Sequence, residues 1–227
     1  MDLRAELVKL LQNVGQENIW RPVHDNENVL LAGGHEDMRD GCPRDLSIVN
    51  FQEKTVLDIG CNFGFYSFLA KRLGAKKVVG IDIDERAITG CNLLKALYGL
   101  DDMHFYAGDL TELNFSDVFD ISIMINFIGK EFVIEGIHGT LNVVEQLSQS
   151  AMIISAQPNY GIVKHLGGNT KNILRLYSTR YIKNHRFFLV DFLRDYFRDN
   201  WDMSIISPDY DDPVKRTLLF TRKKVSL

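Results

Sequence analysis

The sequence has little cysteine, no long apolar run and no basic leader, and each absence excludes a class of protein. Its three cysteines, Cys42, Cys61 and Cys91, are an odd number without paired spacing, so neither a disulfide framework nor a metal site is predicted. A reduced, cytoplasmic setting is the simplest interpretation. No apolar run reaches the roughly 18 residues of a membrane-spanning helix. The first residues also lack the pattern of a signal peptide, so we expect no membrane association.

The composition is that of an ordinary globular protein with a small negative charge. The 227 residues are 45% hydrophobic and 25% charged, which suits one domain with a substantial core. The net charge of −4 argues against a dedicated nucleic-acid binder, although a local basic patch can act alone. We predict a single domain over 1–227. Within it, residues 1–50 form a helical and loop-rich cover, and residues 51–227 form a core with an insertion at 157–190.

One stretch, from Val56 to Ser67, organises the rest of the chain. It begins with the apolar residues of a buried parallel strand, continues through a glycine turn and ends in the start of a helix. Gly60 and Gly64 stand where a backbone turns sharply or lets a ligand approach closely. A strand, a glycine turn and a helix N-terminus together predict a nucleotide-type pocket at the carboxyl edge of a sheet.

The spacing of the glycines and an acid in the strand indicate which nucleotide. The dinucleotide fingerprint is G-x-G-x-x-G, whereas this turn is Gly60-x-x-x-Gly64 with Asn62 in place of the middle glycine. Asp58, inside the strand end, would repel a pyrophosphate but suits a ligand with an ammonium group. A ligand with an adenosine end and a cationic amino-acid end is S-adenosylmethionine.

Two further strands end in acids that would complete such a site. Asp82 ends a short apolar strand 18 residues after Gly64, close to the roughly 20-residue offset at which an acid binds ribose hydroxyls. A third strand, near 103–107, is followed by Asp109, which would lie over the adenine edge. We therefore expect Asp58, Asp82 and Asp109 to surround one ligand.

At this point the chain resembles the class I S-adenosylmethionine-dependent methyltransferases. The matching motifs are Val56–Gly64, Gly80–Asp84, Ala107–Leu110 and Phe119–Met124. The resemblance implies an α/β, Rossmann-like sheet of seven mostly parallel strands, with helices on both faces and an antiparallel C-terminal hairpin. It also implies S-adenosylmethionine as the cofactor. The implied cofactor-binding residues are Asp58, Gly60, Cys61, Asn62, Gly64, Asp82, Ile83, Gly108, Asp109, Leu110 and Asn126.

The resemblance also assigns roles and adds a class of acceptor. Asp82 would hold the ribose hydroxyls, Asp109 the adenine amino group, and Asp58 would orient the turn or the ammonium group. The variant Gly-Cys-Asn-x-Gly-Phe-Tyr-Ser, which departs from the family at Asn62, resembles the turn in enzymes that modify the wobble uridine of tRNA. RNA therefore joins small molecules among the candidate acceptors.

Candidate catalytic residues follow the strand predicted at 119–126. Asn126 would contact the acceptor or the cofactor amino group, because loops at the carboxyl ends of strands form the reactive crevice. Lys130 and Glu131 would hold or deprotonate the acceptor, or else form a solvated helix start. A helix near 140–149 and a strand near 152–156 are predicted next, and Tyr160, after that strand, would face the acceptor.

Two other segments carry cationic and aromatic side chains. The cover contains Trp20, Arg21, His24, His35 and Arg39, which would close over a ligand or simply lie on the surface. Residues 163–190 contain six Lys and Arg, two His and no acid. Such a segment can clamp a phosphate- or carboxylate-bearing substrate or an RNA backbone, or it can be a solvated insertion that balances an acidic tail.

The main hypothesis is therefore an enzyme that transfers a methyl group from S-adenosylmethionine by in-line displacement. A non-catalytic S-adenosylmethionine-binding subunit and an NAD-dependent oxidoreductase are the alternatives. The intact set of acids favours the enzyme over the first, and the glycine spacing with Asp58 argues against the second. The acceptor stays open between an anionic or aromatic small molecule and RNA.

Overall fold

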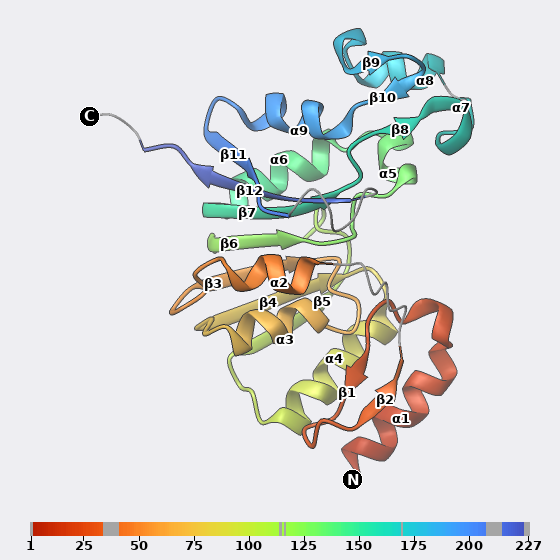
Figure 1. The fold of residues 1–227 in the computed structure, drawn as a ribbon. Coiled ribbons are helices and arrows are strands. Elements are labelled where there is room, and N and C mark those ends of the chain that lie inside the picture. The colour runs from red at the N-terminus through yellow and green to blue at the C-terminus, as the bar shows by residue number, and fades with distance from the viewer. Residues whose placement is uncertain are drawn as a thin grey trace.

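A seven-stranded sheet forms the centre of the computed structural model, which describes residues 2–33, 41–113, 115, 117–168, 170–207 and 215–224. The strand order is β11-β12-β7-β6-β3-β4-β5 (Figure 1). The five strands from β7 to β5 are parallel, whereas β12 runs antiparallel to both of its neighbours. The strands are β3 (Thr55–Ile59), β4 (Lys77–Asp82), β5 (Met103–Ala107), β6 (Phe119–Met124), β7 (Ser148–Ala156), β11 (Trp201–Ile205) and β12 (Arg216–Arg222). The predicted fold class, including the C-terminal hairpin, is confirmed.

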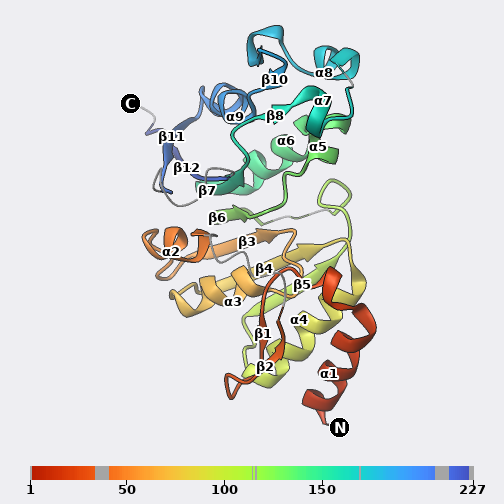
Figure 2. The same ribbon diagram turned by 45° about the vertical axis from the view of Figure 1, so that its right-hand side comes forward.

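Helices cover both faces of the sheet, as Figures 1 and 2 show. One face carries α2 (Cys42–Ser47), α3 (Phe65–Arg72) and α4 (Glu85–Tyr98), with α1 (Leu3–Val14) packed on α4. The other face carries α5 (Lys130–Glu135), α6 (His138–Leu147) and α9 (Leu189–Phe197). Successive strand residues alternate between the two cores: Val56 belongs to the first and Leu57 to the second. Each fully buried side chain of this size contributes about 1.5–3 kcal/mol.

The ends of α4 follow the sequence closely. Asp84 is its N-cap and accepts the backbone N–H of Arg86 at 2.9 Å. Gly99 ends the helix in the left-handed conformation, with φ of 66°. An aspartate before a helix and a glycine after it are sequence signals for these two roles, and this capping fixes the helix directly after the acid-bearing end of β4.

The boundary between α6 and β7 corrects the sequence prediction, which placed a helix at 140–149 and a strand at 152–156. Instead α6 ends at Leu147 and β7 begins at once with Ser148. Ser148 Oγ lies 2.6 Å from the carbonyl oxygen of Val144 and 2.7 Å from Ser122 Oγ. Because this hydroxyl is satisfied inside the protein, a polar residue can begin a buried strand.

The insertion at 157–190 forms a small layer packed on α9. It contains β8 (Tyr160–Gly161), α7 (Ile162–His165), α8 (Thr170–Leu176), the 3-10 turn η2 (Thr179–Tyr181), β9 (Ile182–Lys183) and β10 (Arg186–Phe187), with strand order β8-β10-β9. Tyr177, Tyr181 and Phe187 are buried against Phe192 of α9. The insertion thus shares the core of one face, while its basic side chains are mostly exposed.

The N-terminal cover consists, after α1, of η1 (Gln16–Asn18), β1 (Val23–His24) and β2 (Leu30–Ala32), which lead to α2. The predicted flap residues His35 and Arg39 lie outside the described residues, as does the segment 209–213, whose aspartates and proline predict a turn. In the described parts of the chain, every helix is too short or too polar to cross a bilayer.

Candidate active site

The carboxyl ends of β6, β3, β4 and β5 lie next to one another in that order and border a pocket of about 450 Å³. Most of the expected cofactor residues line it: Gly60, Cys61, Asn62, Asp82, Ile83, Gly108, Asp109, Leu110 and Asn126. Asp58 and Gly64 are not among the lining residues. The structure therefore brings nine of the eleven expected residues together around one pocket and places the other two outside its lining.

The glycine turn leaves no room for a side chain at Gly60. This residue has φ of 71°, and a Cβ there would lie 2.5 Å from Phe127 Cδ2. The N–H groups of Gly60 and Cys61 donate to the carbonyl oxygen of Ile81 at 2.9 and 3.0 Å, which ties the turn to β4. The backbone therefore forms one wall of the pocket directly, as a close-fitting nucleotide site requires.

Gly64 has a packing role. Its φ is 78°, and a Cβ there would lie 2.9 Å from Phe68 Cε2 and 3.2 Å from Cys91 Sγ. Cys91 is fully buried and donates to the carbonyl oxygen of Asn62 at 3.1 Å. These contacts hold the underside of the turn against α4, so Cys91 is a core residue.

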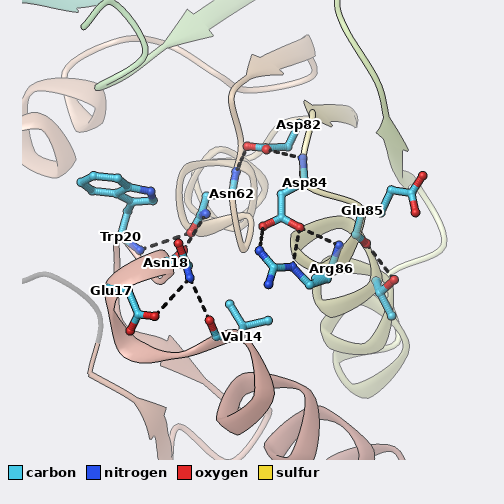
Figure 3. A network of polar contacts seen from close by, with 10 residues as sticks. Val14, Glu17, Asn18, Trp20, Asn62, Asp82, Asp84, Glu85 and Arg86 are labelled. Carbon is cyan, nitrogen blue, oxygen red and sulfur yellow. Dashed lines mark hydrogen bonds and ion pairs between the residues drawn. The ribbon is translucent and has the colours of Figure 1, made fainter.

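Asp82 fixes the turn from the end of β4. Its carboxylate accepts the N–H of Asn62 at 2.8 Å and the N–H of Asp84 at 2.9 Å (Figure 3). Each carboxylate oxygen can accept more than one hydrogen bond, so ligand hydroxyls can bind beside these amides. The position of Asp82 in the pocket lining suits the predicted contact with ribose.

Asn62 connects the turn to the N-terminal cover, a contact that sequence reasoning missed. Its Nδ2 donates to the carbonyl oxygen of Asn18 at 3.1 Å, and its Oδ1 accepts the N–H of Trp20 at 3.3 Å (Figure 3). Asn62 has φ of 48°, a conformation that asparagine tolerates better than most residues. The departure from a middle glycine thus gives a side chain that joins the cover to the pocket.

Asp109 lies at the other end of the pocket, after β5. Hydrogen bonds from the hydroxyl and the N–H of Thr111, both 2.7 Å long, hold the pKa of Asp109 below its usual range. The carboxylate is therefore ionised and oriented, which suits the predicted contact with an amino group of adenine.

Asp58 lies outside the pocket lining and is only 2% exposed. Ser67 Oγ donates to its carboxylate at 2.5 Å. Burial raises the pKa of Asp58 to about 7, and the nearby charge of Asp82 adds to the rise. The residue joins the strand β3 to the helix α3 beneath the turn, so it can orient the turn as predicted.

This buried acid predicts a pH dependence of stability. The folded-state pKa of about 7 exceeds the value of about 3.9 in an unfolded chain. The proton on Asp58 therefore stabilises the fold fully below about pH 4, and this contribution is lost as pH rises through about 7.

Asp58→Asn keeps an acceptor for Ser67 and removes the titration. In urea unfolding between pH 5 and 8, we expect the wild type to lose stability relative to this variant. The exposed Asp117→Asn is the control, and parallel profiles for wild type and Asp58→Asn would contradict the assignment.

Of the candidate catalytic residues, Asn126 is the one that lines the pocket. Its N–H donates to Ser155 Oγ and its Oδ1 accepts Lys215 Nζ, both at 2.7 Å. It has φ of 59°, an unusual conformation that these contacts support.

The other three candidates lie elsewhere. Lys130 and Glu131 are exposed in the first turn of α5, where their charged atoms are 3.5 Å apart. Tyr160 is buried in the core and donates to the carbonyl oxygen of Ile128 at 3.2 Å. Neither location is part of the pocket lining. Lys130 and Glu131 therefore belong to a solvated helix start, and Tyr160 has a packing role.

Aromatic residues form much of the remaining lining, and Trp20 and Arg21 of the cover join them. Sequence reasoning did not assign Phe65, Tyr66, Phe127 and Phe132 to the pocket. Phe65 and Tyr66 directly follow Gly64, and Phe127 directly follows Asn126, so their adjacency to the motifs was a usable signal. The ring centres of Phe127 and Phe132 lie 4.6 Å apart, and the two rings form one wall of the pocket.

The described residues contain no group of His, Cys, Asp and Glu side chains arranged to hold a metal ion. Two features of the pocket bear on its ligand. The turn at Gly60 lets a ligand contact the backbone, because a Cβ there would collide with Phe127. The carboxylates of Asp82 and Asp109, at the ends of β4 and β5, line the pocket. These features fit S-adenosylmethionine, whose adenosine offers hydroxyl and amino donors to carboxylates.

Comparison with known proteins agrees with this geometry. The sequence profile of a family described as a methyltransferase domain matches residues 50–179. The ribosomal protein L11 methyltransferase of Colwellia psychrerythraea is 43% identical over 77 residues, which are 30% of this chain and 26% of that protein. The chain thus matches about a quarter of the length of this curated relative.

Solved structures share the fold at low identity. Magnesium protoporphyrin IX methyltransferase from Synechocystis PCC 6803, with bound S-adenosylmethionine, superimposes with a TM-score of 0.54 at 18% identity, over 82% of this chain and 78% of that one. The bifunctional kinase-methyltransferase WbdD gives a TM-score of 0.57 at 19% identity, over 97% of this chain and 46% of that one. With the family profile matching more than half of its residues, the chain belongs to the methyltransferase-domain family of class I, S-adenosylmethionine-dependent methyltransferases.

Proposed function

We propose that this methyltransferase acts on a small acceptor with an aromatic or anionic group, which enters the pocket at its β6 side. Asp82 binds the ribose hydroxyls, Asp109 binds the adenine amino group, and the backbone of Gly60 to Asn62 lies beside the amino-acid part of the cofactor. Asp58 supports the turn from beneath. The strand order supports this arrangement, because β5, β4, β3 and β6 present these residues in sequence along one edge.

The observation that carries the proposal is the contrast between the two ends of the pocket. Carboxylates lie at the ends of β4 and β5, whereas Phe127 and Phe132 follow β6 and Tyr66 lies on α3. S-adenosylmethionine supplies a methyl group already activated by a positively charged sulfur. The chain's own contribution is then to hold the acceptor in line and exclude water, for which an aromatic wall is suited.

Labelling with radioactive S-adenosylmethionine tests the acceptor class. The purified protein is incubated with separate RNA, protein and small-molecule fractions of a cell extract, with Asp82→Ala as the inactive control. We expect label in the small-molecule fraction with the wild type only. Label confined to RNA or protein would overturn the proposed acceptor class, and no transfer to any fraction would contradict the proposed activity of the pocket.

RNA is a second candidate acceptor, favoured by the exposed basic residues of the insertion. Lys164, Lys171 and Lys183 are exposed, whereas Arg180 pairs with Asp195 at 3.3 Å. None of the basic residues described in this segment lines the pocket. Binding of unmodified tRNA that falls with salt and is lost in a Lys164→Gln, Lys171→Gln, Lys183→Gln triple variant would favour RNA. Equal binding by wild type and variant would remove this candidate.

A further inference from the structure

A short segment of the N-terminal cover, residues 18–22, borders the pocket, and we call it the rim segment. Four of its residues line the pocket: Asn18, Trp20, Arg21 and Pro22. The fifth, Ile19, is only 1% exposed and belongs to the core that α1 and α4 share. The rim segment is therefore anchored to the core by one buried side chain, while its neighbours in the chain border the ligand site.

Asn62 joins the rim segment to the carboxylate of Asp82. Its backbone N–H donates to that carboxylate at 2.8 Å. Its side chain accepts the N–H of Trp20 at 3.3 Å and donates to the carbonyl oxygen of Asn18 at 3.1 Å (Figure 3). A single residue thus connects the acid assigned to the ribose with the backbone of the rim segment, so a ribose at Asp82 lies one residue away from this segment.

Trp20 brings a large aromatic ring to this border. The residue is 60% exposed although it lines the pocket. Tryptophan provides a large, rigid area of contact, and burial of that area by a ligand stabilises the complex. An exposed ring at the mouth of a pocket is therefore a surface that a bound ligand can cover.

The side chain of Asn62 makes contacts that the glycine turn itself does not need. Asn62 has φ of 48°, a conformation that glycine adopts without steric cost. A glycine at this position would keep the backbone N–H that Asp82 accepts, but it would remove both hydrogen bonds to the rim segment. The asparagine therefore acts on the rim segment, beyond forming the turn.

We propose that the rim segment covers the ribose and amino-acid part of bound S-adenosylmethionine, with Trp20 in contact with the cofactor and Asn62 as the positioning residue that holds the segment in place. This inference rests on the proposed placement of the ribose at Asp82. A segment that is already fixed loses less conformational freedom when the ligand binds, so the hydrogen bonds of Asn62 increase cofactor affinity.

Tryptophan fluorescence with S-adenosylhomocysteine tests the contact. The chain has two tryptophans, and Trp201 is only 2% exposed, so acrylamide quenches mainly Trp20. Trp20→Phe leaves Trp201 as the one fluorophore and gives the background. We expect saturating S-adenosylhomocysteine to reduce acrylamide quenching in the wild type and to leave quenching in Trp20→Phe unchanged.

Calorimetric titration of Asn62→Gly tests the positioning role. The variant loses two neutral hydrogen bonds to the rim segment, so we expect S-adenosylhomocysteine to bind about tenfold more weakly. Trp20 should also be quenched more strongly than in the wild type when both proteins are saturated. Asn184→Gly is the matched control, because Asn184 has the same φ of 48° but is exposed between β9 and β10 and does not line the pocket.

Trp20→Ala tests the contact without a change in the glycine turn. It removes an exposed side chain, and we expect about tenfold weaker binding of S-adenosylhomocysteine. Trp20→Phe keeps an aromatic ring, so recovery of affinity relative to Trp20→Ala would identify a ring contact. Urea unfolding of each variant measures stability separately from affinity. If Asn62→Gly proves less stable than Asn184→Gly, the affinity of Trp20→Ala decides the proposal.

The outcomes separate this inference from the proposed function. Unchanged quenching of the wild type on binding S-adenosylhomocysteine, or equal affinity of wild type and Trp20→Ala, would overturn the contact with Trp20. Equal affinity of wild type and Asn62→Gly would overturn the positioning role. Failure of the wild type to bind S-adenosylhomocysteine would instead contradict the cofactor site itself.

Discussion

Asp82→Ala is expected to weaken S-adenosylmethionine binding by at least about 100-fold. The carboxylate accepts the N–H of Asn62 in the glycine turn and the N–H of Asp84 at the start of α4. We propose that it also accepts the ribose hydroxyls. Hydrogen bonds to a charged group contribute about 1.5–3 kcal/mol each, and a loss of about 3 kcal/mol corresponds to a factor of roughly 100. Isothermal titration of the cofactor against both proteins measures the difference.

Two further variants make this result specific. Asp82→Asn keeps the size and one acceptor, so we expect an intermediate loss of affinity. Asp117→Ala removes an exposed acid that pairs with Lys77 at the amino end of β4, far along the strand from the pocket. It is expected to bind the cofactor like the wild type. Equal affinity of Asp82→Ala and wild type would remove Asp82 from the site.

Gly60→Ala is expected to abolish measurable cofactor binding and to destabilise the fold. The left-handed conformation costs a residue with a Cβ about 1–2 kcal/mol. The new Cβ would also lie 2.5 Å from Phe127 Cδ2, and such overpacking costs typically about 1–3 kcal/mol. Relief of the collision moves the Phe127 ring or the turn, and both border the pocket. Urea unfolding and calorimetric titration measure the two effects.

Gly99→Ala is the matched control for this prediction. Gly99 has φ of 66°, close to that of Gly60, but a Cβ there would meet no atom within 4 Å. The control therefore carries the conformational cost without the collision, and it lies at the far end of α4. We expect a loss of stability of about 1 kcal/mol and unchanged cofactor affinity. A loss of affinity in both variants would show that the turn is not a specific part of the site.

Local sequence patterns were sufficient for the sheet and for the residues that border the pocket at the ends of β3, β4 and β5. Parallel strands end at one edge, so the acids that follow β4 and β5 were bound to lie near the glycine turn. The caps of α4 were equally local, since Asp84 and Gly99 act on neighbouring backbone groups. Such features depend on residues close together in the chain, which is why periodicity and spacing predicted them.

The β6 side of the pocket and the link between the glycine turn and the N-terminal cover depend on contacts between distant segments, which the sequence patterns did not predict. Lys215 meets Asn126 from 89 residues away, and Asn18 meets Asn62 from 44 residues away. Neither pair has a spacing that a motif could show. Tyr160 was predicted to face the acceptor, but its ring lies in the core on the α9 side, where burial of the ring is favourable and the hydroxyl keeps a hydrogen bond to the carbonyl oxygen of Ile128.

A crystal structure with S-adenosylhomocysteine tests the central claim most directly. We expect ribose hydroxyls within hydrogen-bonding distance of the Asp82 carboxylate, the adenine amino group at Asp109, and the sulfur on the side of Asn126. Ligand bound elsewhere, or bound here with its adenine at the β6 side, would contradict it.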